Sequence, residues 1–172
     1  DIAANPTVLS GDIDVVDDAS DNVHHVVLAV FASTTPTTRL DGFTIIEGNA
    51  DVSSNITVNG EAIYRDSGGG IYTFRGTNTL TNNSLSGNSS ILAGGGIYTF
   101  GGTTTLTNNS LSGNTAGRDG GGIYTFRGTN TLTNNSLSGN KAADIHVGNC
   151  TPNSRHTLTN HDLTGHTAVH RS

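Results

Sequence analysis

The chain has 172 residues, with 23 Gly, no Trp or Met, and a net charge of −6 at pH 7. The length fits one domain, and no apolar run approaches the roughly 20 residues of a membrane span. The acidic balance and the lack of a basic groove exclude nucleic acid as an expected partner.

Residues 1–67 are predicted to form irregular N-terminal coils with long loops. Ile46-Glu47-Gly48-Asn49 matches the later segment Leu85-Ser86-Gly87-Asn88 at a spacing of 85 − 46 = 39 residues. Leu9-Ser10-Gly11-Asp12 matches the segment at Ile46 at a spacing of 46 − 9 = 37. Both spacings exceed the period found further along the chain, so we expect insertions near residues 13–22 and 50–67.

Residues 68–140 hold three near-identical blocks, 68–88, 94–114 and 120–140. Each block reads GGGIYTF, a short Gly/Thr link and TLTNNSLSGN. The blocks begin 94 − 68 = 26 and 120 − 94 = 26 residues apart. A fixed period of this length, in residues that alternate apolar and polar side chains, predicts a β-solenoid.

Each block is predicted to supply three strands, which in the first block are Gly70–Phe74, Asn78–Asn82 and Ser84–Ser86. Gly or Asn separates them where the backbone must turn. Three strands and three turns per coil describe a parallel β-helix whose coils stack at roughly 4.8 Å. Its interior is expected to hold three apolar ladders: Ile71, Ile97 and Ile123; Leu80, Leu106, Leu132 and Leu158; and Leu85, Leu111, Leu137 and Leu163.

Residues 141–172 are predicted to form a degenerate C-terminal coil and a tail. Leu158 and Leu163 continue the period, because 158 − 132 = 26 and 163 − 137 = 26. The first strand of this coil is expected at Asp144–Val147. We therefore expect a single all-β domain over residues 1–172, a β-solenoid of about five to six coils.

The repeat resembles a known group of proteins. GGGIY followed by TLTN and LSGN resembles the right-handed β-helix repeats of bacterial polymorphic outer-membrane proteins and autotransporter-passenger-like surface proteins. NPTVLSGDID at 5–14 and LDGFTIIEGNA at 40–50 are similar to the N-terminal part of such domains. The resemblance implies a right-handed β-helix that serves as an adhesin, a surface scaffold or, less often, a polysaccharide-processing enzyme.

A Thr-x-Thr pattern recurs in the second strand of successive coils. We expect these side chains to form one flat outer face, with spacings of roughly 7 Å along the strand and 4.8 Å between coils. The face comprises Thr79, Thr81, Thr105, Thr107, Thr131, Thr133, Thr157 and Thr159. It suits packing against another solenoid, or binding of a surface glycan or ice. Thr is also a good β-former at any exposed strand position, so these interpretations remain open.

Asn residues recur at one turn of each block. Asn82, Asn108 and Asn134, followed by Asn83, Asn109 and Asn135, are expected to stack there. Their amides can hydrogen-bond from coil to coil. We predict a structural Asn ladder at Asn82, Asn108 and Asn134.

An acidic cluster near the N-terminus comprises Asp12, Asp14, Asp17, Asp18 and Asp21. Carboxylates and backbone oxygens can wrap Ca²⁺, but an EF-hand loop would need Gly and Glu at set offsets. A solvated acidic loop without a cofactor is the favoured interpretation, with Ca²⁺ as the alternative. The repeats carry no acids clustered with a base, so no residue is assigned to catalysis and we do not expect an enzyme. A polysaccharide-processing fragment that uses this loop is a second alternative.

The histidines gather late in the chain, at His146, His156, His161, His166 and His170. Imidazoles five residues apart can meet at a metal. His161 and His166, however, occupy the repeat positions of Asn135 and Asn140, which explains them equally as polar turn residues. Cys150, the single Cys, forms no internal disulfide. It is either a half-buried residue of the last coil or a site for an intermolecular disulfide.

The two ends of the chain carry opposite charge. Residues 1–66 hold eleven acids and two bases, net −9, and residues 67–172 hold six bases and three acids, net +3. Complementary ends favour head-to-tail contact, and such a contact that does not close makes a filament. The start at Asp1 without a signal peptide predicts a processed, exported protein. We therefore expect an extracellular structural or adhesive solenoid that self-associates into a fibre or surface layer.

Overall fold

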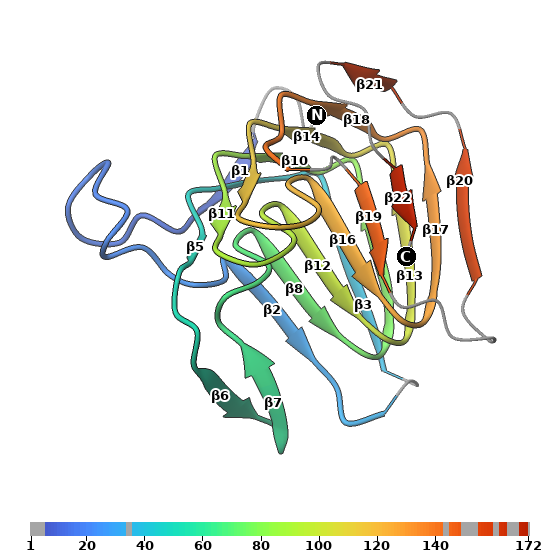
Figure 1. Cartoon of the computed structure of the whole chain (residues 1–172), viewed down its shortest axis with the longest axis horizontal. Helices are drawn as coiled ribbons and strands as arrows, with labels where there is room; N and C mark the ends of the chain where they lie inside the picture. The colour runs from blue at the N-terminus through green and yellow to red at the C-terminus, as the bar shows by residue number, and fades with distance from the viewer. Residues whose placement is uncertain are drawn as a thin grey trace.

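The computed structural model describes residues 6–33, 36–142, 145–148, 155–159, 162–164 and 169–171. Through these residues the chain winds as strands and turns into a parallel β-helix, which confirms the fold expected from the sequence (Figure 1). Within the described ranges no helix is long and apolar enough to cross a membrane.

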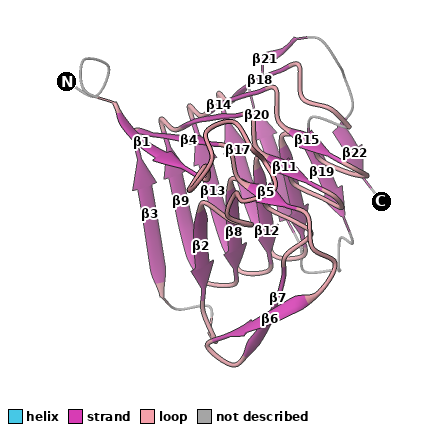
Figure 2. Ribbon diagram, turned by 90° about the vertical axis from the view of Figure 1, so that its left-hand side faces the viewer, coloured by secondary structure: helices cyan, strands magenta, loops and turns pink. Residues whose placement is uncertain are grey.

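Three long sheets form the walls of the coil (Figure 2). Sheet A contains β1 (Thr7–Ser10), β4 (Phe43–Ile46), β10 (Ser84–Ser86), β14 (Ser110–Ser112), β18 (Ser136–Ser138) and β21 (Asp162–Thr164). Sheet B contains β2 (Val27–Val30), β8 (Ile71–Phe74), β12 (Ile97–Phe100), β16 (Ile123–Phe126), β19 (Ile145–Gly148) and β22 (Val169–Arg171). Sheet C contains β3 (Thr37–Asp41), β9 (Thr77–Thr81), β13 (Thr103–Thr107), β17 (Thr129–Thr133) and β20 (Arg155–Thr159).

A short fourth sheet, which the sequence analysis did not predict, lines the corner after sheet A. It consists of β5 (Asn49–Ala50), β11 (Ser89–Ser90) and β15 (Thr115–Ala116). Strands of two residues are too short for an alternating pattern, so periodicity gives no signal for them. The chain thus passes through sheets B, C and A and this corner in each full coil.

The apolar ladders fill the interior as predicted. Ile97 lies opposite Ile71 and Ile123, and the corresponding Leu residues of sheets C and A are paired in the same way. These interior side chains are no more than 1% exposed. At the C-terminal end Leu158 lies opposite Leu132, and Leu163 opposite Leu137, so the extension of the period is also confirmed.

Two details of the predicted alignment differ in the structure. Leu85 lies opposite Ile45, not Ile46, and Ile45 lies opposite Leu9. The true spacings are therefore 85 − 45 = 40 and 45 − 9 = 36. Both Ile residues are apolar, and only the pleat decides that Ile45 points inward, where it is fully buried.

The last-coil strand β19 begins at Ile145, and Asp144 lies outside the described residues.

Two insertions interrupt the N-terminal coils. The first is the loop that joins β1 to β2, which Figure 1 shows projecting from the side of the stack. The second contains an antiparallel hairpin of β6 (Asn55–Val58) and β7 (Glu61–Tyr64). Its two-residue turn, Asn59-Gly60, has φ values of 51° and 79°, the left-handed conformation that such hairpins require.

Candidate functional site

The outer face of sheet C carries a grid of Thr side chains, which we call the Thr face. In β13, Thr105 and Thr107 lie opposite the equivalent Thr residues of β9 and β17. These side chains are half-buried and alternate with fully buried inward residues. The register of β20 places Thr157 and Thr159 one coil further along.

A third column completes the Thr face and was missed by the sequence analysis. It consists of Thr77, Thr103 and Thr129, which are in register on the same three strands. β9 begins one residue earlier than expected, at Thr77. The run of three Thr at 103–105 was the available signal. On β3 the column of Thr77 continues at Thr37, whereas Arg39 and Asp41 take the place of Thr in the other two columns and form an ion pair of 2.7 Å.

The predicted Asn ladder occupies a surface column, and the buried ladder belongs to the neighbouring residues. Asn82, Asn108 and Asn134 are exposed and have φ values of 53–55°. Nδ2 of Asn108 reaches Oδ1 of Asn82 at 3.5 Å. The column one residue later is almost fully buried and contains Asn83, Asn109 and Asn135.

A second buried Asn ladder, Asn88, Asn114 and Asn140, lies at the next turn. Nδ2 of Asn114 donates to the Leu85 carbonyl and to Oδ1 of Asn140, both at 3.0 Å. Oδ1 of Asn114 accepts the backbone N–H and the side-chain Nδ2 of Asn88. Each amide therefore uses both its donor and its acceptor capacity, and the ladders serve the fold, not a ligand.

The acidic loop directs its carboxylates at its own backbone. Asp12 accepts the N–H of Asp17 at 3.1 Å, and Asp21 accepts the N–H of Val15 at 2.8 Å. Asp18 accepts the N–H of Ser20 at 2.9 Å, and hydrogen bonds from Ser20 lower the pKa of Asp18. Across the described residues, no three His, Cys, Asp or Glu side chains are placed to hold a metal ion.

Two columns of aromatic rings cover the outer face of sheet B, which we call the aromatic face. Tyr72, Tyr98 and Tyr124 stack with centroid distances of 4.9 and 5.3 Å. Phe74, Phe100 and Phe126 follow at 4.9 and 5.3 Å. The IYTF sequence contained this information, because its residues alternate between the interior and the surface.

The hairpin β6–β7 covers only the first part of the aromatic face. Ile63, which is fully buried, belongs to one cluster with Tyr72 and Phe74, and Val58 packs against that cluster. Beyond the hairpin lies an open groove of about 290 Å³, which we call the aromatic groove. It is lined by Tyr64, Ser67, Leu92, Tyr98, Phe100, Tyr124 and Phe126.

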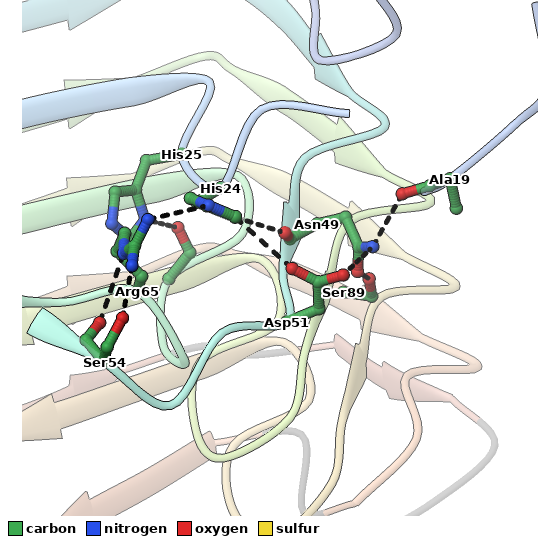
Figure 3. Close-up of polar contacts among 9 residues, drawn as sticks. Ala19, His24, His25, Asn49, Asp51, Ser54, Arg65 and Ser89 are labelled. Carbon is green, nitrogen blue, oxygen red and sulfur yellow. Dashed lines mark hydrogen bonds and ion pairs between the residues drawn. The ribbon is translucent and has the colours of Figure 1, made fainter. Parts of the chain in front are cut away.

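A polar cluster, also missed from the sequence, joins the loop before β2 to the base of the hairpin (Figure 3). Nδ1 of His24 lies 3.3 Å from the Asn49 carbonyl and 3.4 Å from Oδ1 of Asp51. Nη1 of Arg65 donates to Nε2 of His24 at 3.5 Å, and the same guanidinium binds the carbonyl and Oγ of Ser54. Because His24 contacts Asp51 through one ring nitrogen and Arg65 through the other, the arrangement acts as a clamp between loops.

His25 is the buried neighbour of this cluster. Its Nδ1 lies 3.0 Å from the Gly68 carbonyl, and its ring packs against Tyr72 at 5.1 Å. Burial lowers the pKa of His25 to about 4. The ring is therefore neutral at pH 7 and donates its Nδ1 proton to the carbonyl.

The late histidines are described only in part. β19 and β22 place His146 and His170 opposite each other on neighbouring coils, and His156 lies in β20 opposite Asn130. His161, His166 and Cys150 lie outside the described residues.

Comparison with known proteins agrees with this geometry. Residues 33–172 match the family model described as a right handed beta helix region, so the chain belongs to the right-handed β-helix family. No curated protein and no solved structure matches the chain.

Proposed function

We propose that this protein is an extracellular structural or adhesive β-solenoid that stacks head to tail into a fibre or surface layer. Secretion and a surface role are what its resemblance to polymorphic outer-membrane and autotransporter-passenger proteins implies. Two features of the molecule support stacking: the open strands of the first coil and the opposite charges at the two ends.

The open first coil carries this proposal. Among the described residues, β1, β2 and β3 each pair on one side only, so three strand edges lie open at one end of the stack. The inward side chains there, Leu9, Val27 and Leu40, are half-buried, whereas their counterparts one coil inward are at most 1% exposed. Open strand edges above a half-buried core favour the addition of further strands.

Charge favours addition of the opposite end of a second copy. The acidic loop at residues 12–21 follows β1 at the open first coil. Arg155 and Arg171 lie on β20 and β22, the last strands of sheets C and B. Opposite charge at the two ends steers head-to-tail contact and disfavours head-to-head contact.

Sedimentation velocity over a range of concentrations tests this proposal. The wild-type chain should form species that grow with concentration, and Leu9→Lys should remain monomeric because it places a charge on the stacking surface. Val8→Lys is the matched control, since Val8 lies on the same strand, is 51% exposed and points away from the core. A wild-type chain that stays monomeric at every concentration would contradict stacking.

The Thr face supports a second candidate function, binding of a surface glycan or ice. Its three columns on β9, β13 and β17 form a regular grid without a charged side chain. Spacings of roughly 7 Å and 4.8 Å follow from strand geometry. Such a repeat suits a ligand surface that is itself periodic.

A further inference from the structure

The aromatic face contains two equivalent positions for a ligand, and among the described residues the hairpin fills the first of them. Arg75 and Arg127 are 127 − 75 = 52 residues apart, two full periods, within identical stretches that read IYTFRGTNTLTNN. Each guanidinium lies over the preceding Phe ring, at 4.9 Å for Phe74 and 5.1 Å for Phe126. The two coils therefore present the same rings and the same cation.

The hairpin shows what the first position accepts. Ile63 and Val58 supply aliphatic side chains to the cluster that contains the Tyr72 and Phe74 rings. Glu61 supplies a carboxylate that accepts a hydrogen bond of 2.6 Å from Nη1 of Arg75. A β-peptide with aliphatic side chains on one face and a nearby carboxylate thus satisfies this chemistry.

At the second position, the described residues include no counterpart of the Glu61 carboxylate for Arg127. Phe126 is half-buried in the aromatic groove and lies opposite Gly148, which has no side chain. Arg127 is exposed and, among the residues that the structure describes, pairs with no carboxylate. Gly101 replaces Arg in the coil between, and the Arg127 guanidinium also lies 5.8 Å from Phe100.

The hairpin interface continues directly into the open position. Tyr98 belongs to the cluster beneath the hairpin and also lines the aromatic groove. Tyr64, the last residue of β7, lines the groove as well. An added peptide would thus extend an interface that already exists.

We propose that the aromatic groove binds an extended acidic peptide segment of a partner protein. Its aliphatic side chains lie on the Tyr and Phe rings, and its carboxylate pairs with Arg127. The rings favour a peptide over a sugar, because Tyr98 and Tyr124 stack face to face at 7° and present mainly their edges outward. Stacking of a pyranose needs a free ring face. This site lies on the side of the coil and is independent of end-to-end association.

The hairpin itself supplies the probe. A cyclised, fluorescently labelled peptide with the sequence of residues 55–64 is titrated with the full chain, and binding is followed by anisotropy. We expect saturable binding that Arg127→Gln weakens about tenfold or more, the effect of losing one charge-assisted hydrogen bond. Glu→Gln in the peptide, at the position of Glu61, should weaken binding to the wild-type chain equally and binding to Arg127→Gln hardly at all.

Two comparisons make the result decisive. Arg39→Gln removes an Arg from sheet C and should leave the affinity unchanged, while Phe126→Ala should weaken binding. Because the Glu→Gln change is made in the peptide, it needs no protein variant to fold. Binding that is insensitive to Arg127, or no binding of the peptide, would overturn the proposal. Arg127-dependent binding of a trimeric uronic acid in place of the peptide would overturn the peptide assignment.

Discussion

Asn109 donates a hydrogen bond of 3.0 Å from its Nδ2 to Oδ1 of Asn135, one coil further along. The same Nδ2 donates to the Leu80 carbonyl, and Oδ1 of Asn109 accepts from the backbone and the side chain of Asn83. The residue is 1% exposed, so water cannot replace these partners. The buried Asn ladder therefore joins coils that the apolar core alone would hold only through non-directional contacts.

Loss of this amide should destabilise the fold strongly. We expect Asn109→Ala to lower the free energy of unfolding by about 3 kcal/mol, because it leaves several buried donors and acceptors without partners. Asn108→Gly, at the adjacent exposed position with φ of 55°, should change it by less than about 1 kcal/mol. Urea unfolding followed by circular dichroism measures both. Equal losses would contradict the assignment of the ladder to the Asn109 column.

A methyl group added at Gly95 should also destabilise the chain. A Cβ there would lie 2.3 Å from the Thr115 carbonyl oxygen and 2.6 Å from its carbon, and backbone in a closed coil cannot move away easily. We expect Gly95→Ala to cost about 3 kcal/mol or more. Gly113→Asn is the control, because no atom lies within 4 Å and Asn tolerates the φ of 63°. Its midpoint in urea should stay close to that of the wild type.

The buried His25 should make stability depend on pH. Its pKa falls from 6.5 in the unfolded chain to about 4 in the folded one. Between these values the unfolded state binds a proton that the folded state does not, so stability rises with pH. The contribution is fully present above pH 6.5 and is lost as pH falls toward 4, by up to about 3 kcal/mol.

Carboxylates titrate in the same pH range. The contribution of His25 is therefore measured as the difference in unfolding free energy between the wild type and a His25 variant. His25→Phe should flatten the loss of unfolding free energy between pH 7 and pH 4 relative to the wild type. A pH profile that keeps its slope in the variant would show that His25 does not carry the effect.

The second candidate function predicts that the centre of the Thr face is sensitive to bulk. Thr105→Tyr should abolish most ice shaping or glycan-array binding, because the ring interrupts all three columns. Ser110→Tyr places the same ring at an exposed position of sheet A and should have no effect. If Thr105→Tyr and Ser110→Tyr shape ice or bind glycans equally well, the Thr face is not the binding surface.

The period of 26 residues determines the register of the coils, and this part of the structure followed from the sequence. Each interior Leu or Ile recurs between fixed polar neighbours, so its burial could be inferred from the repeat alone. The N-terminal coils lack that repeat. There the choice between Ile45 and Ile46 depends on the pleat and on strand pairing, which a single apolar pair does not specify.

The surfaces were harder to infer for a different reason. The outward Tyr and Phe of IYTF become a groove only where the hairpin ends, and the hairpin is an insertion outside the repeat. His24, Asp51 and Arg65 come from three separate segments and meet only in the folded chain. The sequence placed both Asn columns at this turn but did not show which one is buried, because Asn82 and Asn83 have the same side chain and differ in backbone conformation.

Negative-stain electron microscopy of the purified chain, over a range of concentrations near neutral pH, tests the proposed stacking most directly. We expect filaments with an axial repeat of about 25–30 Å, the length of five to six coils at roughly 4.8 Å each. The filaments should be absent from Leu9→Lys and present in Val8→Lys. Uniform single particles at every concentration of the wild-type chain would contradict the account.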